Sequence, residues 1–234
     1  MTQRIFFNLC TTPPHKCGYL SNKLATTLFI EPETPKTASL YDNLSQQGFR
    51  RSGGDIYRPD CYGCNACIPV RIPVQKFVPR RSQRRVWQKN YDLTVSAVPA
   101  SFKSEHFNLY RRYLSSRHLD NPNPNTYTQF LICSWARTKF YEFRLNKKLV
   151  AVAVIDHLKH GLSAMYTFFD PDYPARSLGV YAILWQIEET KRLNLDWLYL
   201  GYWIKDCKKM NYKTEYQPLE YYYREKWQPE AKII

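Results

Sequence analysis

The sequence predicts an α/β fold, of the α+β type, in which a mixed sheet is flanked by helices. Three short runs rich in Val, Tyr and Phe, at residues 140–145, 149–158 and 162–169, are separated by turn residues and predict a three-stranded antiparallel meander. A helical segment follows, and residues 197–204 predict another buried strand. Because sequential elements usually pack together, we expect this strand to return beside the meander. With 44% hydrophobic residues, the 234-residue chain can fill such a core.

Helical periodicity predicts three helices in the second half of the chain. Aromatic and leucine side chains at helical spacing predict a helix over residues 104–117, and another is expected from Tyr127 to Trp135. The clearest helix comes later, with Ser177 placed as its N-cap. Its apolar positions follow the i, i+3, i+4, i+7 pattern and are Val180, Ile183, Leu184 and Ile187.

Clusters of Pro, Gly and Asn mark the breaks between elements. Residues 31–37 and 120–125 are interpreted as loops, and residues 52–60 as a turn-rich approach to a group of cysteines. A change in composition near residue 100 predicts a domain boundary. It separates a Cys-rich, basic N-terminal domain, residues 1–100, from a C-terminal α/β domain, residues 101–234.

The charge of the chain favours a polyanionic partner. The sequence has 34 Lys and Arg against 20 Asp and Glu, a formal net charge of +14, together with 19 Tyr. Cations hold phosphates while aromatic faces stack on unpaired bases, so single-stranded RNA suits this composition better than duplex. No apolar run approaches the roughly 20 residues that cross a bilayer, and residues 1–9 lack a signal-peptide pattern. We therefore expect a cytoplasmic protein with no membrane partner.

The seven cysteines favour reduced thiols or metal ligands, because an odd number without regular spacing argues against a disulfide framework. Cys61, Cys64 and Cys67 form a C-x-x-C-x-x-C motif, so that three thiolates from one tight loop can face a single centre. Cys10 or Cys17 would supply a fourth ligand. Four thiolates suit zinc or an iron–sulfur cluster, and free structural thiols are the alternative.

A basic strip follows the cysteines. Residues 61–91 contain no Asp or Glu, and the segment RRSQRR adds a hydroxyl and an amide to four guanidinium groups. This composition matches phosphate oxygens and 2′-hydroxyls of RNA, whereas the alternative is a solvated basic face. The basic residues of the strip are Arg71, Lys76, Arg80, Arg81, Arg84, Arg85 and Lys89, and RRSQRR also includes Ser82 and Gln83.

The junction between the meander and the clearest helix, YTFFDPDYPARSLGV, is a candidate catalytic segment. A helix entered through Arg-Ser-Leu-Gly presents free backbone N–H groups to an anion or a developing oxyanion. Asp170 precedes Pro171, so it is either a catalytic carboxylate or a turn residue.

Longer motifs resemble one known family. YRPDCYGCNACIPVRIPVQKFVPRRSQRRVWQKN resembles the N-terminal signature of the arginyl-tRNA–protein transferase family, and KCGYLSNKLATTLF resembles its opening segment. The C-terminal half agrees in YTFFDPDYPARSLGVYAILWQIEETKRL, YLGYWI and KMNYKTEYQPLEYY, so the resemblance covers nearly the whole chain. The chain length and the compact cysteine block are similar to the bacterial leucyltransferase branch.

The resemblance implies both a fold and an activity. The implied fold is a pair of acetyltransferase-like lobes with a Cys-rich N-terminal segment. The implied activity is transfer of leucine from leucyl-tRNA to proteins that begin with Asp or Glu, which marks them for degradation. The implied partners are leucyl-tRNA and these acceptor proteins.

A mechanism can be proposed from these residues. An aminoacyl ester is already activated, so the chemistry requires no cofactor, and the enzyme must position the acceptor's neutral α-amine against the ester carbonyl. We expect the basic strip to bind tRNA and Arg80 or Arg81 to bind the acceptor's carboxylate. Asp170 is predicted to accept a proton, while hydroxyl groups orient the ester or stabilise the oxyanion. The predicted catalytic residues are Asp170, Tyr166, Ser177 and Tyr202, and the predicted substrate-binding residues are Arg71, Arg80, Arg81, Ser82, Gln83, Arg84, Arg85 and Lys213.

Three other functions stay open at this point. Arginine in place of leucine as the donor would need buried acids, and several glutamates and aspartates are available. An acetyl-coenzyme A-dependent N-acetyltransferase fits the meander–helix–strand order but leaves RRSQRR without a role. A non-enzymatic RNA-binding zinc module accounts for the cysteines and the charge but leaves the aromatic second half without one.

Overall fold

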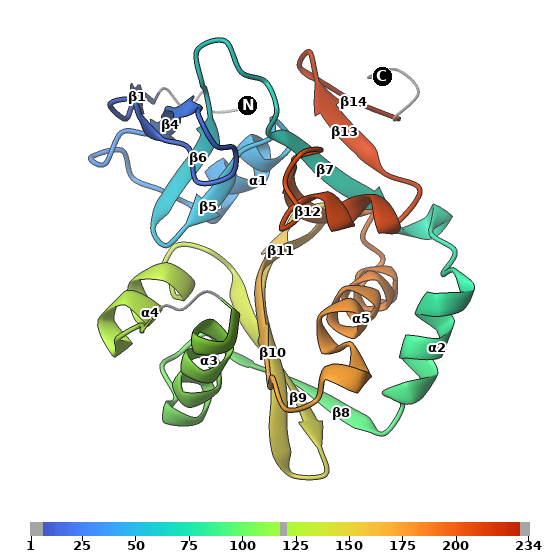
Figure 1. Cartoon of the computed structure of the whole chain (residues 1–234). Helices are drawn as coiled ribbons and strands as arrows, with labels where there is room; N and C mark the ends of the chain where they lie inside the picture. The colour runs from blue at the N-terminus through green and yellow to red at the C-terminus, as the bar shows by residue number, and fades with distance from the viewer. Residues whose placement is uncertain (1–6, 118–120, 230–234) are drawn as a thin grey trace.

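The protein is built on a large mixed sheet with a smaller sheet packed against one end (Figure 1). The computed structural model describes residues 7–117 and 121–229. In spatial order the large sheet contains β14 (Lys226–Pro229), β13 (Glu220–Tyr223), β7 (Ile68–Pro73), β12 (Trp197–Trp203), β11 (Gly161–Phe169), β10 (Lys148–Leu158), β9 (Thr138–Leu145) and β8 (Leu93–Pro99). The smaller sheet contains β1 (Leu9–Thr11), β4 (Thr27–Ile30), β6 (Asp55–Pro59) and β5 (Arg50–Ser52), and β2 (His15–Lys16) pairs with β3 (Leu24–Ala25).

Helices cover both faces of the large sheet (Figure 1). The α-helices are α1 (Ala38–Ser45), α2 (Arg81–Lys89), α3 (Ser104–Arg117), α4 (Pro124–Leu131) and α5 (Leu178–Arg192), and three 3-10 turns are η1 (Val74–Lys76), η2 (Pro174–Arg176) and η3 (Asn211–Glu215). The apolar run of β10 explains the layering, because successive strand residues point to opposite faces. Val152 and Val154 belong to the core beneath α3 and α4, whereas Ala153 and Ile155 belong to the core beneath α5.

The prediction of an α/β fold with an antiparallel meander is confirmed. Strands β9, β10 and β11 pair antiparallel in sequence order, and β12 returns beside β11. The helix predicted over residues 104–117 is α3. The proposed division at residue 100 stays a prediction. Strands from both of its sides enter the large sheet, since β7 and β8 precede the division and the other six follow it.

Several local predictions need correction. The second helix runs from Pro124 to Leu131 rather than from Tyr127 to Trp135, because Asn123 caps it. Ser177 occupies the N-cap position of α5, but its side chain makes no capping hydrogen bond. The segment at residues 52–60 contains the strand β6 after its turn.

Two further expectations concern other parts of the chain. The Tyr-rich segment at residues 220–229 forms the hairpin of β13 and β14, which was not predicted from the sequence. Residue 120 of the predicted loop at 120–125 lies outside the described residues, as do residues 1–6 of the segment searched for a signal peptide. In the described part of the chain, no helix is long and apolar enough to cross a membrane.

The parallel pair β11–β12 is hydrogen-bonded only at its start. Its register covers three residues on each strand, from Gly161 opposite Trp197 to Ser163 opposite Tyr199. Beyond this point β11 remains paired with β10 and β12 remains paired with β7, so β11 and β12 are no longer paired with each other. A register shift between Tyr199 and Gly201 marks the same place on β12. The sheet is therefore split at this position.

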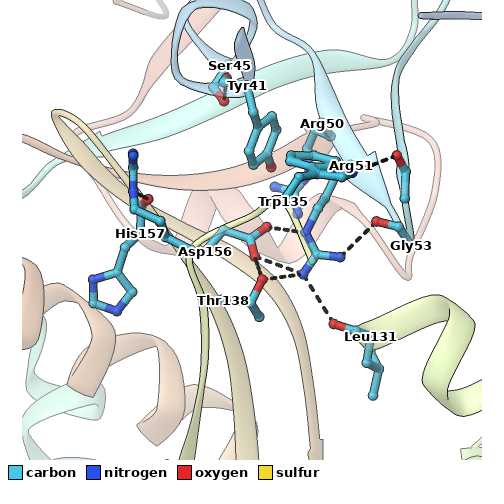
Figure 2. Close-up of polar contacts among 12 residues, drawn as sticks. Tyr41, Ser45, Arg50, Arg51, Gly53, Leu131, Trp135, Thr138, Asp156 and His157 are labelled. Atoms are coloured by element: carbon cyan, nitrogen blue, oxygen red, sulfur yellow. Dashed lines mark hydrogen bonds and ion pairs between the residues drawn. The ribbon is translucent and has the colours of Figure 1, made fainter. Parts of the chain in front are cut away.

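A buried ion pair joins the smaller sheet to the large one (Figure 2). Arg51 on β5 donates from Nε and Nη2 to the two carboxylate oxygens of Asp156 on β10, each at 2.8 Å. Its Nη1 donates to the carbonyl oxygen of Gly53 at 3.1 Å, and its Nη2 also lies 3.3 Å from the carbonyl oxygen of Leu131 and 3.1 Å from the hydroxyl of Thr138. These contacts connect β5 to β10, to the start of β9 and to the C-terminus of α4.

Glu142 anchors α3 to the sheet and should make stability depend on pH. Burial alone would raise the pKa of Glu142, but hydrogen bonds from Lys103, His106 and Arg144 outweigh it and lower the pKa to about 2. A depressed carboxyl pKa stabilises the fold above the unfolded value of 4.5, and this contribution is lost as the pH falls toward 2.

We therefore expect Glu142→Gln to lower the free energy of unfolding at pH 7 by about 3 kcal/mol. Urea titrations between pH 7 and pH 2 measure this. The difference between wild type and variant should shrink as the pH falls below about 4.5. A difference that stays constant across this range would contradict the assignment.

Candidate active site

Arg50 lies at the split between β11 and β12. It comes from β5, next to Arg51, and its Nη2 donates to the carbonyl oxygen of Ala164 on β11 at 2.9 Å. Gly201 on β12 has a φ of +80°, and a Cβ there would lie 2.7 Å from Arg50 Nη1. The bare backbone of Gly201 therefore makes room for the guanidinium group.

Tyrosines surround this guanidinium group. Arg50 lowers the pKa values of Tyr19, Tyr57, Tyr202 and Tyr212 against a larger rise from burial, so all four hydroxyls lie within its electrostatic reach. Burial raises the pKa of Tyr19 to about 12 although 42% of its surface is exposed, and Tyr212 is 43% exposed. We call Arg50, Lys213 and these four tyrosines the Arg50 cluster.

Lys213 brings a second cation to the cluster. It follows Tyr212 in η3, and only 3% of its surface is exposed. Its Nζ contacts Met210 Sδ at 3.5 Å and lies 4.8 Å from the ring centroid of Tyr212. Burial, with a smaller contribution from the nearby charge of Arg50, lowers the pKa of Lys213 to about 7. Lys213 is among the residues predicted from the sequence to bind substrate, and the structure places it within the electrostatic reach of Arg50.

The predicted catalytic residues do not gather around one point. Asp170, at the end of β11, pairs with Arg112 at 2.8 Å and with Lys148 at 3.1 Å. Burial would raise its pKa, but hydrogen bonds from the backbone N–H of Asp172, from Lys148 and from Arg112 lower it. Such contacts are typical of a structural carboxylate that ties α3 to the sheet.

The three predicted hydroxyl residues occupy different surroundings. Tyr202 is buried, and its hydroxyl lies 3.1 Å from the Gly48 carbonyl oxygen and 3.2 Å from that of Tyr57, which ties β12 to the smaller sheet. Tyr166 packs against Phe130 with ring centroids 5.2 Å apart. Ser177 has a left-handed conformation, with φ 51°, between η2 and α5. Their catalytic roles stay predictions.

The basic strip is divided by the fold. Arg71 is enclosed, with its guanidinium carbon 3.9 Å from the ring centroid of Trp197 and 4.2 Å from that of Trp227, and it pairs with Glu220 at 2.7 Å. The segment RRSQRR begins α2, which packs on the outer side of α5 (Figure 1). Exposed side chains on α2 and at its N-cap are Arg80, Arg81, Ser82, Arg84, Arg85 and Lys89.

Three residues of RRSQRR make contacts within the chain, and the first of these is Arg84, which donates from Nη1 to the Pro79 carbonyl oxygen at 2.7 Å. Arg80 pairs with Glu215 at 2.7 Å in an exposed ion pair. Gln83 is buried and donates from Nε2 to the Glu215 carbonyl oxygen at 2.9 Å. A cavity of about 330 Å³ opens beside them between α2 and α5, and its lining includes Phe77, Pro79, Gln83, Arg84, Trp87, Gln88, Leu184 and Glu188.

Four of the five predicted metal ligands come near one another. Burial, with smaller contributions from the nearby thiols of Cys61, Cys17 and Cys64, raises the pKa of the Cys67 thiol to about 12, and all four cysteines line one cavity. Backbone N–H groups of residues 19 and 20 donate to Cys17 Sγ, each at 3.5 Å. Cys10 lies apart on β1, opposite Phe29. Across residues 7–117 and 121–229, no three His, Cys, Asp or Glu side chains are arranged to hold a metal ion.

Arg50, Tyr19 and Tyr57 were missed by the sequence analysis. The available signal was the pair Arg50–Arg51 beside a Gly-Gly turn. In a strand, two adjacent side chains point to opposite faces, so only one of two adjacent arginines can pair with a given partner. Arg51 forms the ion pair with Asp156, whereas Arg50 points to the opposite face and contacts β11 at the split between β11 and β12.

Known proteins resemble this chain over nearly its whole length. Two family descriptions match it: "Arginine-tRNA-protein transferase, N terminus" over residues 15–85 and "Arginine-tRNA-protein transferase, C terminus" over residues 105–223. An aspartate/glutamate leucyltransferase from Pseudomonas entomophila is 53% identical over 231 residues, covering 97% of this chain and 98% of that protein. A protein of the same name from Alcanivorax borkumensis is 50% identical over 236 residues, covering 99% and 98%.

A solved structure shares the fold at low identity. It is the C-terminal domain (DUF2156) of an Agrobacterium fabrum protein described as a lysylphosphatidylglycerol synthetase. The TM-score is 0.50 at 14% identity, and the match covers 81% of this chain and 62% of that one. This likeness concerns the fold alone.

The sequence matches define an enzyme that transfers aminoacyl groups. The chain belongs to the arginine-tRNA-protein transferase family, as the match of both family descriptions and the 53% identity establish. Its donor is accordingly an aminoacyl-tRNA and its acceptor a protein. The resemblance stated from the motifs and the predicted enzyme class are confirmed.

Proposed function

We propose that this enzyme transfers leucine from leucyl-tRNA to the α-amino group of proteins that begin with Asp or Glu. The observation that carries the proposal is the 53% identity, over 97% of the chain, with a protein named aspartate/glutamate leucyltransferase. We further propose that it acts in the cytoplasm, where aminoacyl-tRNA is available, and that the new N-terminal leucine marks the acceptor for degradation.

The reaction needs positioning more than activation. The acceptor's neutral α-amine attacks the ester carbonyl, a C–N bond forms, and the C–O bond to the tRNA ribose breaks. The amine loses a proton and the departing ribose hydroxyl gains one. Because the ester is already activated, no covalent nucleophile or cofactor is required. The paired state of Asp170 makes it a weak candidate for the proton acceptor, since its pKa is lowered by two cations.

The exposed face of α2 is the proposed tRNA contact. Arg81, Arg84 and Arg85 are exposed and follow helical spacing, so their guanidinium groups can address one stretch of phosphates. The cavity between α2 and α5 adjoins this face and is lined in part by Trp87 and Phe77. An aromatic-lined cavity beside cations suits an unpaired base of the tRNA end.

Transfer of labelled amino acids from charged tRNA tests this function. We expect leucine to reach peptides that begin with Asp or Glu and not those that begin with Ala. The same assay with arginyl-tRNA should give no product. Arginine transfer would overturn the donor assignment, and transfer from neither tRNA would overturn the function. A coenzyme A binding measurement on the same preparation is expected to be negative, which separates this enzyme from an N-acetyltransferase.

We propose, in addition, that Cys17, Cys61, Cys64 and Cys67 together hold zinc or an iron–sulfur cluster. Support comes from the nearness of their thiols and from the backbone N–H groups that point at Cys17 Sγ. Elemental analysis and absorption spectra of anaerobically purified protein measure this. We expect about one zinc ion or one cluster per chain, reduced in Cys61→Ser and unchanged in Cys133→Ser. Metal-free protein with full activity would contradict it.

A further inference from the structure

The Arg50 cluster contains two basic side chains that no carboxylate of the described residues neutralises. Arg50 Nη1 is buried and has no hydrogen-bond partner in the described structure. Among the residues that the structure describes, Lys213 Nζ contacts the Met210 sulfur and the ring of Tyr212. Within the described residues, neither cation forms an ion pair with a carboxylate.

Such an arrangement is unfavourable unless an anion completes it or Lys213 gives up its proton, and an anion bound there would keep Lys213 charged. Withdrawing a cation from water without a partner costs several kcal/mol, so buried Lys and Arg are nearly always paired. The adjacent Arg51 illustrates the contrast, because all of its contacts are made within the chain and Asp156 balances its charge. Arg50 and Lys213 therefore differ from a structural ion pair, because within residues 7–117 and 121–229 no carboxylate pairs with either of them.

The position of the cluster points to a substrate. It lies where β11 and β12 separate, between the two sheets, and Gly201 keeps the backbone clear of the guanidinium group. Tyr19 and Tyr212 belong to the cluster and remain partly exposed, so it is in contact with solvent. A small anion entering there would meet the planar donors of Arg50, the ammonium group of Lys213 and tyrosine hydroxyls.

We propose that Arg50 and Lys213 bind the side-chain carboxylate of the acceptor's N-terminal Asp or Glu. This proposal rests on the proposed function, since it identifies the groups that select the acceptor. It replaces Arg80 and Arg81, which are exposed on α2, as the partners of that carboxylate.

A carboxylate fits the cluster better than an RNA phosphate does. The exposed arginines of α2 lie on the opposite side of α5 from the smaller sheet, and they offer a continuous face for a phosphate backbone (Figure 1). The cluster instead offers the buried Nη1 of a partly buried arginine and a buried lysine within its electrostatic reach, which suits a single small anion. Buried charged donors also reject an uncharged analogue strongly, because Asn or Gln would leave the cations unneutralised.

Binding of pentapeptides to the purified full-length enzyme tests the proposal independently of the donor amino acid. The probes are a peptide that begins with Asp and its counterpart that begins with Asn. We expect wild type to bind the Asp peptide more tightly, and Arg50→Gln and Lys213→Met each to weaken that binding on the order of 100-fold. The Asn peptide should be affected far less, so the Asp-to-Asn preference should collapse.

Three matched measurements make the result decisive. Arg50→Lys keeps the charge and should retain part of the preference. Arg58→Gln removes an arginine of the neighbouring strand, where it stacks on Phe49 with its guanidinium carbon 4.9 Å from the ring centroid, and should leave the preference unchanged. Charged-tRNA affinity should be the same for all folded variants, with folding checked by thermal melting.

The outcomes separate this inference from the proposed function. If wild type transfers leucine but Arg50→Gln and Lys213→Met keep the full Asp-to-Asn preference, the inference is wrong and the function stands. If both variants lose tRNA affinity while the preference survives, the cluster binds RNA phosphate and the inference is overturned. If arginine is the donor yet the preference collapses in the variants, the inference stands and the donor assignment fails.

Discussion

Asp156→Asn is expected to destabilise the protein by about 3–5 kcal/mol, because it leaves the buried guanidinium group of Arg51 without a counter-charge. Burial would lower the pKa of Arg51, but Asp156 outweighs this effect and raises it. Arginine also stays charged without such a partner, so the variant contains an unpaired buried charge. The pair is 2.8 Å apart, and the two side chains are 0% and 1% exposed, so solvent does not screen the loss (Figure 2). Urea unfolding followed by tryptophan fluorescence measures the change.

A matched exposed pair provides the control for this prediction. Glu188→Gln removes a carboxylate that pairs with Lys191 on the surface of α5 at 2.9 Å, and it should change stability by no more than about 0.5 kcal/mol. The double variant Arg51→Met, Asp156→Leu should recover part of the stability, since replacing both partners removes the unpaired charge. A single-variant loss as small as that of the control would show that water or another group reaches Arg51.

Combined Arg81→Ala, Arg84→Ala and Arg85→Ala is expected to weaken binding of charged tRNA by about 100- to 1000-fold at physiological salt. All three side chains are exposed on α2, so their loss should leave the fold intact. Each phosphate contact releases counterions, and the slope of log affinity against log salt concentration should become shallower by about 2–3. Fluorescence anisotropy across a potassium chloride series measures affinity and slope together.

An equal change of charge elsewhere separates a binding face from general attraction. Lys139, Lys147 and Lys159 are exposed at or near the ends of β9 and β10, away from α2. Their triple replacement by Ala also removes three positive charges. It should reduce tRNA affinity only slightly and leave the salt slope near that of wild type. If both triple variants lose affinity equally, tRNA responds to net charge and α2 is not its contact.

The two proposed substrate contacts come from different parts of the chain. The tRNA face belongs to α2, which packs on α5, whereas the acceptor contact combines β5 with η3 at the split between β11 and β12. If both hold, the ester and the α-amine meet between these regions. The parallel strands that separate there would then position the two substrates relative to each other.

The sequence alone was sufficient to predict the order of the helices and strands in the C-terminal half of the chain. The apolar runs of β9, β10 and β11 and the helical repeat of α5 are long and regular, and local periodicity reports such elements reliably. Its motifs also identified the family. The N-terminal strands escaped notice because most are only two to five residues long, too short to show alternation, and their pairing depends on distant partners.

Only the tertiary structure decided which charged residues are free to act. Asp170, predicted as a catalytic carboxylate, pairs with Arg112 and Lys148, and Arg71, predicted to bind RNA, is enclosed by tryptophans and Glu220. Arg50 is distinguished from Arg51 by contacts with residues more than 100 positions away. A sequence determines which charged groups are present, but long-range packing determines which of them are neutralised by a partner within the chain.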